Sequence, residues 1–350
     1  MSLSQILERL LPLVEADLQT VVCPSHHNLE GYYGMMRYHL GWFDAQFQPR
    51  PANSGKRLRP VLCLLSNEAL GGDVQQALPA ASALELVHNF SLVHDDIQDR
   101  SRFRRGRRAV WDIWGTAQGI NVGDGLFVLA RLAIHRLTER GVSPSRQEAA
   151  TQALDHACLA LCEGQFFDLS FEERLDVDLE QYIWMIGRKT AALLAASTQI
   201  GALVATDDQE LVEHFHRFGE NLGLAFQIQD DILGAWGDES LTGKSAASDI
   251  QTKKKALPAV YALNQSLDPE AAQALAALYN REGPLDAQAT RQALAILDRV
   301  GAREYAEGMA TRYYQQALES LAPLESQPGI QTTALAELCE MAASLLGRQA

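Results

Sequence analysis

Residues 79–99 constrain the fold of this chain more than any other segment, because a helix formed by them is apolar on nearly every side until its acidic end. Residues 190–204 are similarly free of charge. A helix without a polar face must be covered on all sides, which places both segments in the middle of a large helical bundle. We expect the acidic end of the first helix to open into a central cavity.

Helical periodicity dominates the remainder of the chain, and the alternation typical of strands is essentially missing. One apolar stripe near the N-terminus consists of Ile6, Leu10, Leu13, Val14 and Leu18. Helix-breaking residues fall between the periodic segments, at 49–55, 71–72, 141–144, 283–284 and 323–329. No repeat or change of composition marks a linker, so we predict an all-α fold with a single domain over residues 1–350.

The balance of charge argues against a polyanionic partner. The chain has 30 Lys and Arg residues against 44 Asp and Glu residues, and the field of this net charge of -14 repels nucleic acid and anionic membranes. The uncharged stretch 190–206 is too short and too rich in small polar residues to span a membrane. We therefore expect no nucleic-acid partner and no stable membrane insertion.

Cysteine usage and the N-terminus indicate a cytoplasmic protein. The five cysteines are scattered and form neither a CxxC motif nor a zinc-ligand spacing, which is typical of reduced thiols. The first residues lack a basic segment and carry Glu8, Glu15 and Asp17 within an amphipathic helical pattern, unlike a signal peptide.

The first acidic motif is DDIQD, at the end of the apolar segment. Asp95 and Asp99 are four residues apart, so a helix projects them from one face, one turn apart. Such carboxylates repel each other unless a cation neutralises them, and their hard oxygen atoms suit Mg²⁺, which also takes phosphate oxygens of a substrate. For an isolated motif, the alternative is a solvated helix end.

A second acidic motif, Asp230-Asp231, again follows an apolar helical run. Two acidic helix ends, each preceded by a buried helix, are harder to explain as solvated ends than a single one is. If the two motifs face each other across the bundle core, they can hold a metal cluster and a diphosphate between them.

Cationic residues accompany both motifs. Lys56 and Arg59 lie three apart at an expected helix start, where the helix dipole also favours an anion. The arginine-rich run 100–108 can be read as a nucleic-acid patch, but it is short and the chain is acidic, so clamps on a metal-bound diphosphate are the better interpretation. Residues 188–190 open a kinked or continuing buried helix. Lys244 and the lysines at 253–255 follow the second acidic motif, and each of them by itself is more often a surface charge.

The ordered set GKRLRP, DDIQD, RRG, EGQFFDL, KT, FQIQDDILG and GK, within about residues 50–260, resembles the trans-isoprenyl diphosphate synthase (polyprenyl synthetase) family. This resemblance implies an all-α bundle of the isoprenoid synthase type around a deep central cavity, usually a homodimer. It also implies a prenyltransferase that uses Mg²⁺ to ionise an allylic diphosphate (dimethylallyl, geranyl or farnesyl) and condenses it with isopentenyl diphosphate.

The resemblance also implies roles for individual residues. Asp95, Asp99 and Asp230 would ligate Mg²⁺ ions on the allylic diphosphate, with direct contacts from Arg104, Lys189 and Lys244. Lys56, Arg59, His88 and Arg105 would bind isopentenyl diphosphate without metal, although His88 taken alone is more often a core histidine. Supporting positions are Gln165, Asp168, Thr190, Phe226, Gln227 and Lys254.

The second motif departs from many members of the family. It ends in Gly234, where many relatives have a third aspartate. Because Asp230 is intact, we expect activity, with weaker or differently ordered metal binding at this motif.

Product length depends on the residues one to two turns before Asp95, along which the growing hydrocarbon tail should pass. Ser91 is small, whereas Phe90 lies about 7.5 Å back along the helix axis and is large enough to form a floor. Within the family this pair resembles short-chain synthases that make the C20 product, so we predict geranylgeranyl diphosphate, with farnesyl or longer products as alternatives. The other interpretation of Phe90 is simple packing against a neighbouring helix.

Two other functions share the acidic motifs. A class I terpene cyclase uses the same ionisation but binds no second diphosphate, which the cations Lys56, Arg59 and Arg105 argue against. A non-catalytic subunit that modifies a partner synthase should have lost aspartates from both acidic motifs, and only Gly234 suggests such a loss.

Overall fold

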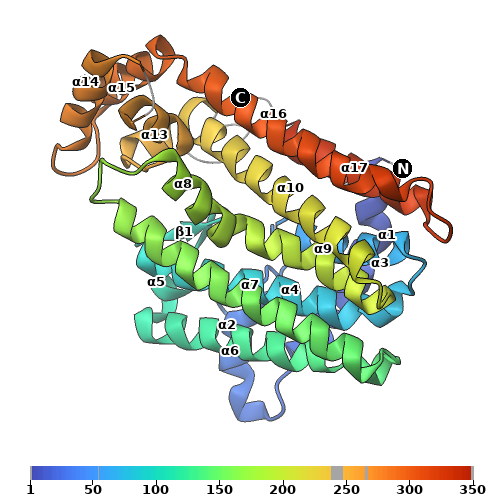
Figure 1. Ribbon diagram of the computed structural model, residues 1–350. Helices are drawn as coiled ribbons and strands as arrows, with labels where there is room; N and C mark the ends of the chain where they lie inside the picture. The colour runs from blue at the N-terminus through green and yellow to red at the C-terminus, as the bar shows by residue number, and fades with distance from the viewer. Residues whose placement is uncertain (1, 54, 238–246, 265–266, 348–350) are drawn as a thin grey trace. The chain divides into compact units, whose positions relative to one another are not determined.

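The computed structural model describes residues 2–53, 55–237, 247–264 and 267–347 (Figure 1). Helices account for 76% of it, and the strands of the described residues are confined to one two-stranded hairpin. The predicted all-α class is therefore confirmed. Within the described ranges, no helix combines the length and the apolar character that crossing a membrane requires.

The elements of the first half of the chain are α1 (Leu3–Val21), η1 (His27–Leu29), α2 (Glu30–His39), α3 (Leu58–Ala69), α4 (Val74–Gln98), β1 (Phe103–Arg104), β2 (Arg107–Arg108), α5 (Val110–Trp114), α6 (Thr116–His135), η2 (Thr138–Arg140) and α7 (Pro144–Phe171). Those of the second half are α8 (Leu179–Ile186), η3 (Gly187–Ala191), α9 (Ala192–Ala205), α10 (Gln209–Trp236), α12 (Ser248–Gln251), α13 (Leu257–Asn264), α14 (Pro269–Tyr279), α15 (Ala287–Arg299), α16 (Ala302–Leu321), η4 (Ala322–Leu324) and α17 (Thr332–Leu346).

The chain forms two compact units, each assembled from segments that are distant in the sequence. Unit 1 consists of Met1–Asp155, Ala196–Phe215 and Leu324–Leu338. Unit 2 consists of His156–Ala195, His216–Pro323 and Cys339–Ala350. A single domain over residues 1–350 stays a prediction.

Helix α4 is the core element of unit 1. It packs against α1, α3 and α6 (Figure 1). Nearly every side chain from Ala77 to Val93 is buried, as its apolar sequence predicts. Asp73 caps its first turn by accepting a hydrogen bond from the Gln75 backbone N–H at 2.9 Å. On α1, the predicted stripe is buried except for Leu13, which is half-buried.

Helix α9 approaches α3 within unit 1 at a glycine. A Cβ atom built on Gly201 would overlap the backbone carbonyl of Cys63 and lie 2.9 Å from the Ser66 Cβ atom. The Gly201 carbonyl accepts a hydrogen bond from the Asn67 side chain at 3.4 Å. The helices can therefore be this close only because residue 201 has no side chain.

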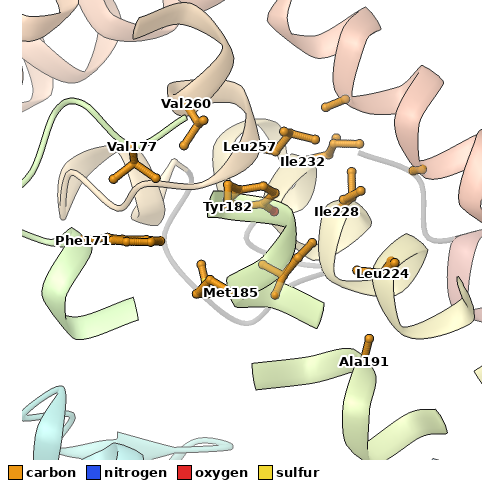
Figure 2. Packing of buried hydrophobic residues seen from close by; sticks show 13 residues of the cluster. Phe171, Val177, Tyr182, Met185, Ala191, Leu224, Ile228, Ile232, Leu257 and Val260 are labelled. Carbon is orange, nitrogen blue, oxygen red and sulfur yellow. The ribbon is translucent and has the colours of Figure 1, made fainter. Parts of the chain in front are cut away.

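Unit 2 has its own core around helix α8. Tyr182 is 1% exposed and lies among Ile228, Ile232 and Leu257, as Figure 2 shows. These residues come from α8, α10 and α13, so the apolar cluster joins the three helices that carry the second acidic motif and its surroundings.

We expect Gly201→Ala to lower the free energy of unfolding by about 1–3 kcal/mol, because the added methyl group meets the fixed carbonyl of Cys63. Gly308→Ala on α16 is the matched control, since a Cβ atom there meets nothing within 4 Å and should stabilise the helix by up to about 1 kcal/mol. Urea unfolding measures both changes. Equal effects of the two substitutions would show that α3 and α9 are not in close contact at Gly201.

Candidate active site

The first acidic motif lies at the C-terminal end of α4, in unit 1. The helix continues to Gln98, and the Asp99 backbone N–H donates to the Asp95 carbonyl at 2.8 Å. Asp95 is half-buried and Asp99 is exposed, so the predicted one-turn spacing on one side of the helix is confirmed. Both carboxylates are placed where a ligand can approach them.

Asp96, the middle acid of the motif, points inward and is 1% exposed. Its Oδ1 atom accepts hydrogen bonds from Arg104 Nε at 2.9 Å and Nη2 at 2.6 Å, while Oδ2 has no hydrogen-bond partner among the described residues. Burial raises the pKa of Asp96, although Arg104 opposes this shift. Arg104, which the resemblance assigns to the allylic diphosphate, is therefore tied to the acidic motif itself.

The hairpin β1–β2 presents the next arginine. At its tip, Arg105 (φ 53°) and Gly106 (φ 75°) both adopt the left-handed region, the pattern of a tight hairpin turn that is unusual for arginine. The Arg105 guanidinium lies against Gly55, where an added Cβ atom would come within 2.6 Å of Nη2. The absence of a side chain at residue 55 lets the loop before α3 meet the hairpin tip.

Other arginines of the run 100–108 have structural partners. Arg102 and Arg108 both bind the carboxylate of Asp112, at 2.8 and 2.5 Å. The Arg107 guanidinium lies 3.8 Å from the centre of the Tyr38 ring and donates to the Tyr38 carbonyl. These contacts favour a folded hairpin over a nucleic-acid patch.

Three arginines near His88 on α4, Arg59, Arg104 and Arg105, form a group that we call the cationic basin. The positive charges of these arginines act on the His88 ring, and His39 has a smaller effect of the same sign. Burial, followed by these positive charges, holds the pKa of His88 well below its usual value, so the ring is neutral at neutral pH. Three of the four residues expected to hold the second diphosphate, Arg59, Arg105 and His88, are therefore brought together.

Lys56, the fourth, is exposed on the loop beside Gly55. Helix α3 begins at Leu58, with Arg57 as its left-handed N-cap residue, so Lys56 precedes the helix and does not share its first turn with Arg59. The expected helix start was therefore placed too early. The reason is the left-handed conformation of Arg57, whose side chain is pulled inward.

Two residues near the cationic basin, Arg57 and His39, were not predicted from the sequence. Arg57 is 3% exposed and donates to Glu15 at 2.9 Å and to Glu85 at 2.7 Å, so its charge is neutralised within the protein. His39 ends α2, and its Nε2 atom is buried without a hydrogen-bond partner in the described part of the chain. Burial, then Arg105 and Arg104, lower the pKa of His39 well below its usual value.

The two predicted chain-length residues lie one to two turns before Asp95. Phe90 is 8% exposed and packs edge-on against Phe127 of α6, with ring centres 5.1 Å apart. The Ser91 hydroxyl is buried and donates to the His88 carbonyl at 2.8 Å. Phe90 does pack against a neighbouring helix, and its role as a floor stays a prediction.

In the second acidic motif, in unit 2, one aspartate is again buried and the other half-buried, as in the first motif. Asp231 is 1% exposed and accepts hydrogen bonds from the Tyr182 hydroxyl at 2.5 Å, Gln227 Nε2 at 3.0 Å and the Leu257 backbone N–H at 2.8 Å. Burial raises its pKa. Asp231 therefore joins α8, α10 and α13, and the half-buried Asp230 is left as the candidate ligand.

The predicted Lys189 and Thr190 lie in a short π-helical segment, Gly187–Ala191, that connects α8 with α9. Such segments often occur at functional sites. Lys189 forms an ion pair with Asp168, and the Thr190 hydroxyl donates to Gln227 Oε1 at 2.7 Å. Gly164 on α7 permits this approach, because a Cβ atom there would lie 2.6 Å from the Lys189 Cα atom.

Lys254 lies near the same carboxylates. Burial alone would lower its pKa, but Asp231, Asp249 and Asp168 outweigh burial and raise it, so the ammonium group stays charged. Lys189, Lys254 and Asp231 line a cavity of about 30 Å³, which has room for an ordered water but not for a diphosphate. Lys244 lies outside the described residues.

Three further predicted positions lie on the same helices of unit 2. Gln165, on α7, is 6% exposed, and Asp168 follows it one turn later. Burial opposes the ionisation of Asp168, yet Lys189 and Lys254 bring its pKa below the usual value. Phe226 is half-buried on α10, immediately before Gln227.

Gly234, where many relatives have a third aspartate, lies against a carboxylate from another helix. A Cβ atom at Gly234 would be 2.5 Å from Cγ of Asp249, on α12. The space next to the second motif is therefore filled by Asp249, a residue that the sequence analysis did not single out. Its only signal in the sequence is its position five residues before Lys254.

The oxygen donors of the two motifs fit Mg²⁺, which favours one or two carboxylates completed by water and phosphate. Asp95 and Asp99 offer two carboxylates on one side of α4, and Asp230 offers one on α10. In the described part of the chain, no group of three or more His, Cys, Asp or Glu side chains is arranged to hold a metal ion. The oxygen donors that are present fit Mg²⁺ held together with water and phosphate oxygens.

Comparison with known proteins points to one family. Residues 42–297 match the family model described as polyprenyl synthetase. The chain is 39% identical over 296 residues to a geranylgeranyl diphosphate synthase of Mycobacterium tuberculosis, covering 85% of this chain and 83% of that protein. It is 38% identical over 319 residues to a (2E,6E)-farnesyl diphosphate synthase of Mycobacterium bovis, covering 90% and 86%.

The fold is likewise similar to that of a solved structure. A polyprenyl synthetase from Streptomyces coelicolor matches with a TM-score of 0.88 at 34% sequence identity, covering 98% of this chain and 99% of that one. The expected all-α fold of the isoprenoid synthase type is therefore confirmed.

We expect Tyr182→Phe to lower the free energy of unfolding by about 1.5–3 kcal/mol, because it removes a hydrogen bond to the buried carboxylate of Asp231. Tyr32→Phe is the matched control, since that exposed hydroxyl donates to the neutral carbonyl of Asn121 at 2.7 Å and should contribute about 1 kcal/mol or less. Chemical denaturation of both variants provides the comparison. A loss at Tyr182 no greater than at Tyr32 would contradict a central role for Asp231.

Proposed function

This chain belongs to the polyprenyl synthetase family and is a trans-prenyltransferase, and we propose that it condenses isopentenyl diphosphate with an allylic diphosphate to make geranylgeranyl diphosphate. One observation carries the proposal. Unit 1 places a cationic basin beside an acidic helix end, with the Arg104–Asp96 ion pair between them. The reaction needs two environments of this kind, because one diphosphate has to stay intact while the other has to leave its carbon.

The cationic basin suits isopentenyl diphosphate, which has to be held intact. Guanidinium groups bind phosphate oxygens in pairs without activating the C–O bond, and Arg59 and Arg105 supply them. The neutral ring of His88 adds one hydrogen bond without adding charge. Lys56, on the exposed loop before α3, would add a further positive charge.

The acidic motifs suit the allylic diphosphate, whose C–O bond must break. Asp95, Asp99 and Asp230 would hold Mg²⁺, which supplies positive charge that stabilises the departing diphosphate. Lys189, which is paired with Asp168, and the charged Lys254 would add cationic contacts, as would Lys244. Binding of one diphosphate by both motifs stays a prediction.

The residues of the chain then determine the fate of the allylic cation. Holding the isopentenyl double bond next to it lowers the barrier by roughly 7–11 kcal/mol through positioning alone. The C–C bond forms as the double bond attacks the cation, and the proton lost from the adjacent carbon passes to the departing diphosphate. Excluding water prevents the cation from being hydrolysed.

The C20 product is the finer part of the proposal. Phe90 fills the space one to two turns below Asp95, which would stop a growing tail after few additions. The similar proteins named above include both a geranylgeranyl and a farnesyl diphosphate synthase, so the C15 product is the alternative.

The other two functions are disfavoured by particular residues. A terpene cyclase has no use for a second diphosphate site such as that around His88. A subunit without activity has no need to keep Asp95, Asp99 and Asp230, all of which this chain retains.

We also propose that the active form is a homodimer. On α6, Ile120, Val128 and Leu132 lie on one side of the helix and are 47%, 54% and 58% exposed. On α7, Leu159 and Phe166 are 57% and 65% exposed. Apolar side chains left open at helical spacing are typical of surfaces that are covered by a partner.

A cytoplasmic location stays a prediction. The five cysteines are free thiols.

The test of the function is product analysis with purified full-length protein. The protein is incubated with Mg²⁺, with isopentenyl diphosphate, and with dimethylallyl, geranyl or farnesyl diphosphate in turn, and the products are identified by mass. The proposal predicts C20 diphosphate from each starter. Hydrocarbon formed without isopentenyl diphosphate would favour a cyclase, and turnover only after adding a partner synthase would favour a modifying subunit.

We expect Asp95→Asn to lower turnover by about 100-fold or more, because the loss of a metal ligand removes several kcal/mol of charge stabilisation. The melting temperature should stay near that of the unmodified protein, since the Asp95 side chain is only half-buried. Glu139→Gln, at an exposed acid on η2, is the control and should leave both values unchanged. Undiminished turnover in Asp95→Asn would refute the metal assignment.

We expect Leu132→Asp and Phe166→Asp each to shift the protein from dimer to monomer, because a charge placed in an apolar interface loses its hydration. Light scattering after size-exclusion chromatography gives the mass directly. Leu267→Asp, at an exposed leucine outside these two helices, should leave the mass unchanged. A dimer that persists in Leu132→Asp would contradict an interface on α6, and one that persists in Phe166→Asp would contradict an interface on α7.

A further inference from the structure

Helices α4 and α6 run antiparallel along a close seam in unit 1. Ile97 lies against Gly119, where an added Cβ atom would be 2.8 Å from its side chain. One turn further from the acidic end of α4, the His94 ring lies over Gly123, and its Nε2 atom is 3.1 Å from the carbonyl of Ile120. The seam therefore begins at the acidic motif and continues away from it.

The next layer of the seam is aromatic. Phe90 meets Phe127 edge-on, with ring centres 5.1 Å apart and planes at 62°, and meets the His94 ring at 5.8 Å and 82°. A ring held between two others has little freedom to rotate about its side-chain bonds. Phe127 therefore helps determine where the Phe90 ring lies.

We propose that Phe127 is a second determinant of product length, acting as a positioning residue that holds Phe90 across the path of the growing tail. The inference rests on the proposed function and adds to it a residue that is 28 positions downstream of the first acidic motif in the sequence. The floor is then a two-helix structure, with one ring from α4 and one from α6.

The burial pattern supports this role. Phe127 is half-buried, whereas its neighbours Leu126 and Ala130 on α6 are fully buried. On α4, the residues one turn below Phe90, Leu86 and Val87, are also fully buried. The residues next to the aromatic pair are thus fully buried, and shortening either ring would create space in the layer of Phe90 and Phe127 itself.

The space that loss of one ring would open is one turn of helix deep, about 5.4 Å. This depth is comparable with the length of one isoprene unit. Removing the Phe127 ring should free Phe90 to swing aside and admit one further unit. Removing both rings should admit more than either change alone, because the path is then open on both helices.

The experiment compares the products of full-length Phe127→Ala, Phe90→Ala and the double variant with those of the unmodified enzyme. Each is supplied with Mg²⁺, farnesyl diphosphate and isopentenyl diphosphate. We expect products longer than the normal one to increase about tenfold or more in each single variant, the range by which a pocket discriminates groups of this size. The double variant should give the longest products, and Phe127→Trp, which thickens the floor, should shift them to shorter lengths.

Leu129→Ala is the matched control, because it removes a buried side chain two residues after Phe127, which a helix places about 200° around its axis from Phe127, and its product lengths should stay normal. If Phe127→Ala does not fold, Phe127→Leu and Phe127→Trp still test the idea by their opposite shifts. An unmodified enzyme that forms no condensation product would refute the proposed function. Normal condensation with unchanged product lengths in all Phe127 variants would overturn the role of Phe127 alone.

Discussion

The high cost of burying a charge without a partner governs how this chain uses its carboxylates. Each acidic motif contains two adjacent aspartates at the end of a buried helix, and adjacent helical residues point about 100° apart. One member of each pair therefore turns inward. Asp96 is buried against Arg104, and Asp231 is buried among Tyr182, Gln227 and Leu257. The half-buried Asp95 and Asp230 remain the candidates for ligand binding.

The inward aspartates have a consequence for the outward ones. Because Asp231 joins three helices by hydrogen bonds, the position of its neighbour Asp230 is set by the core of unit 2. In unit 1, Asp96 draws Arg104 and the hairpin that carries it towards the end of α4. A preorganised site of this kind does not have to rearrange when charge develops during the reaction.

Positive charges are handled differently in the two units. In unit 1, Arg57 is neutralised by Glu15 and Glu85, while Arg59 and Arg105 lie together beside His88. Glu85 and Asp96 also lie near Arg105, and the cluster of guanidinium groups favours the binding of an anion by its positive field. In unit 2, Lys254 lies near several carboxylates and keeps its charge in spite of burial. The cationic basin is therefore suited to a diphosphate that carries no metal ions. Lys254 is suited to a site whose carboxylates would also bind metal cations.

The amino-acid sequence determined the helical class, the buried course of α4 and the spacing of Asp95 and Asp99, because these follow from local periodicity and from residues within one turn of each other. Family resemblance added Lys189, Thr190 and Gln227, and the structure brings Thr190 and Gln227 into hydrogen-bond contact. Only the tertiary structure decided which aspartate of each pair turns inward, that Arg104 binds Asp96, that Asp249 fills the space beside Gly234, and that Phe127 meets Phe90. These contacts join residues from different helices or across the hairpin, and sequence periodicity shows which face of a helix is apolar but not which side chain of another element will lie against it.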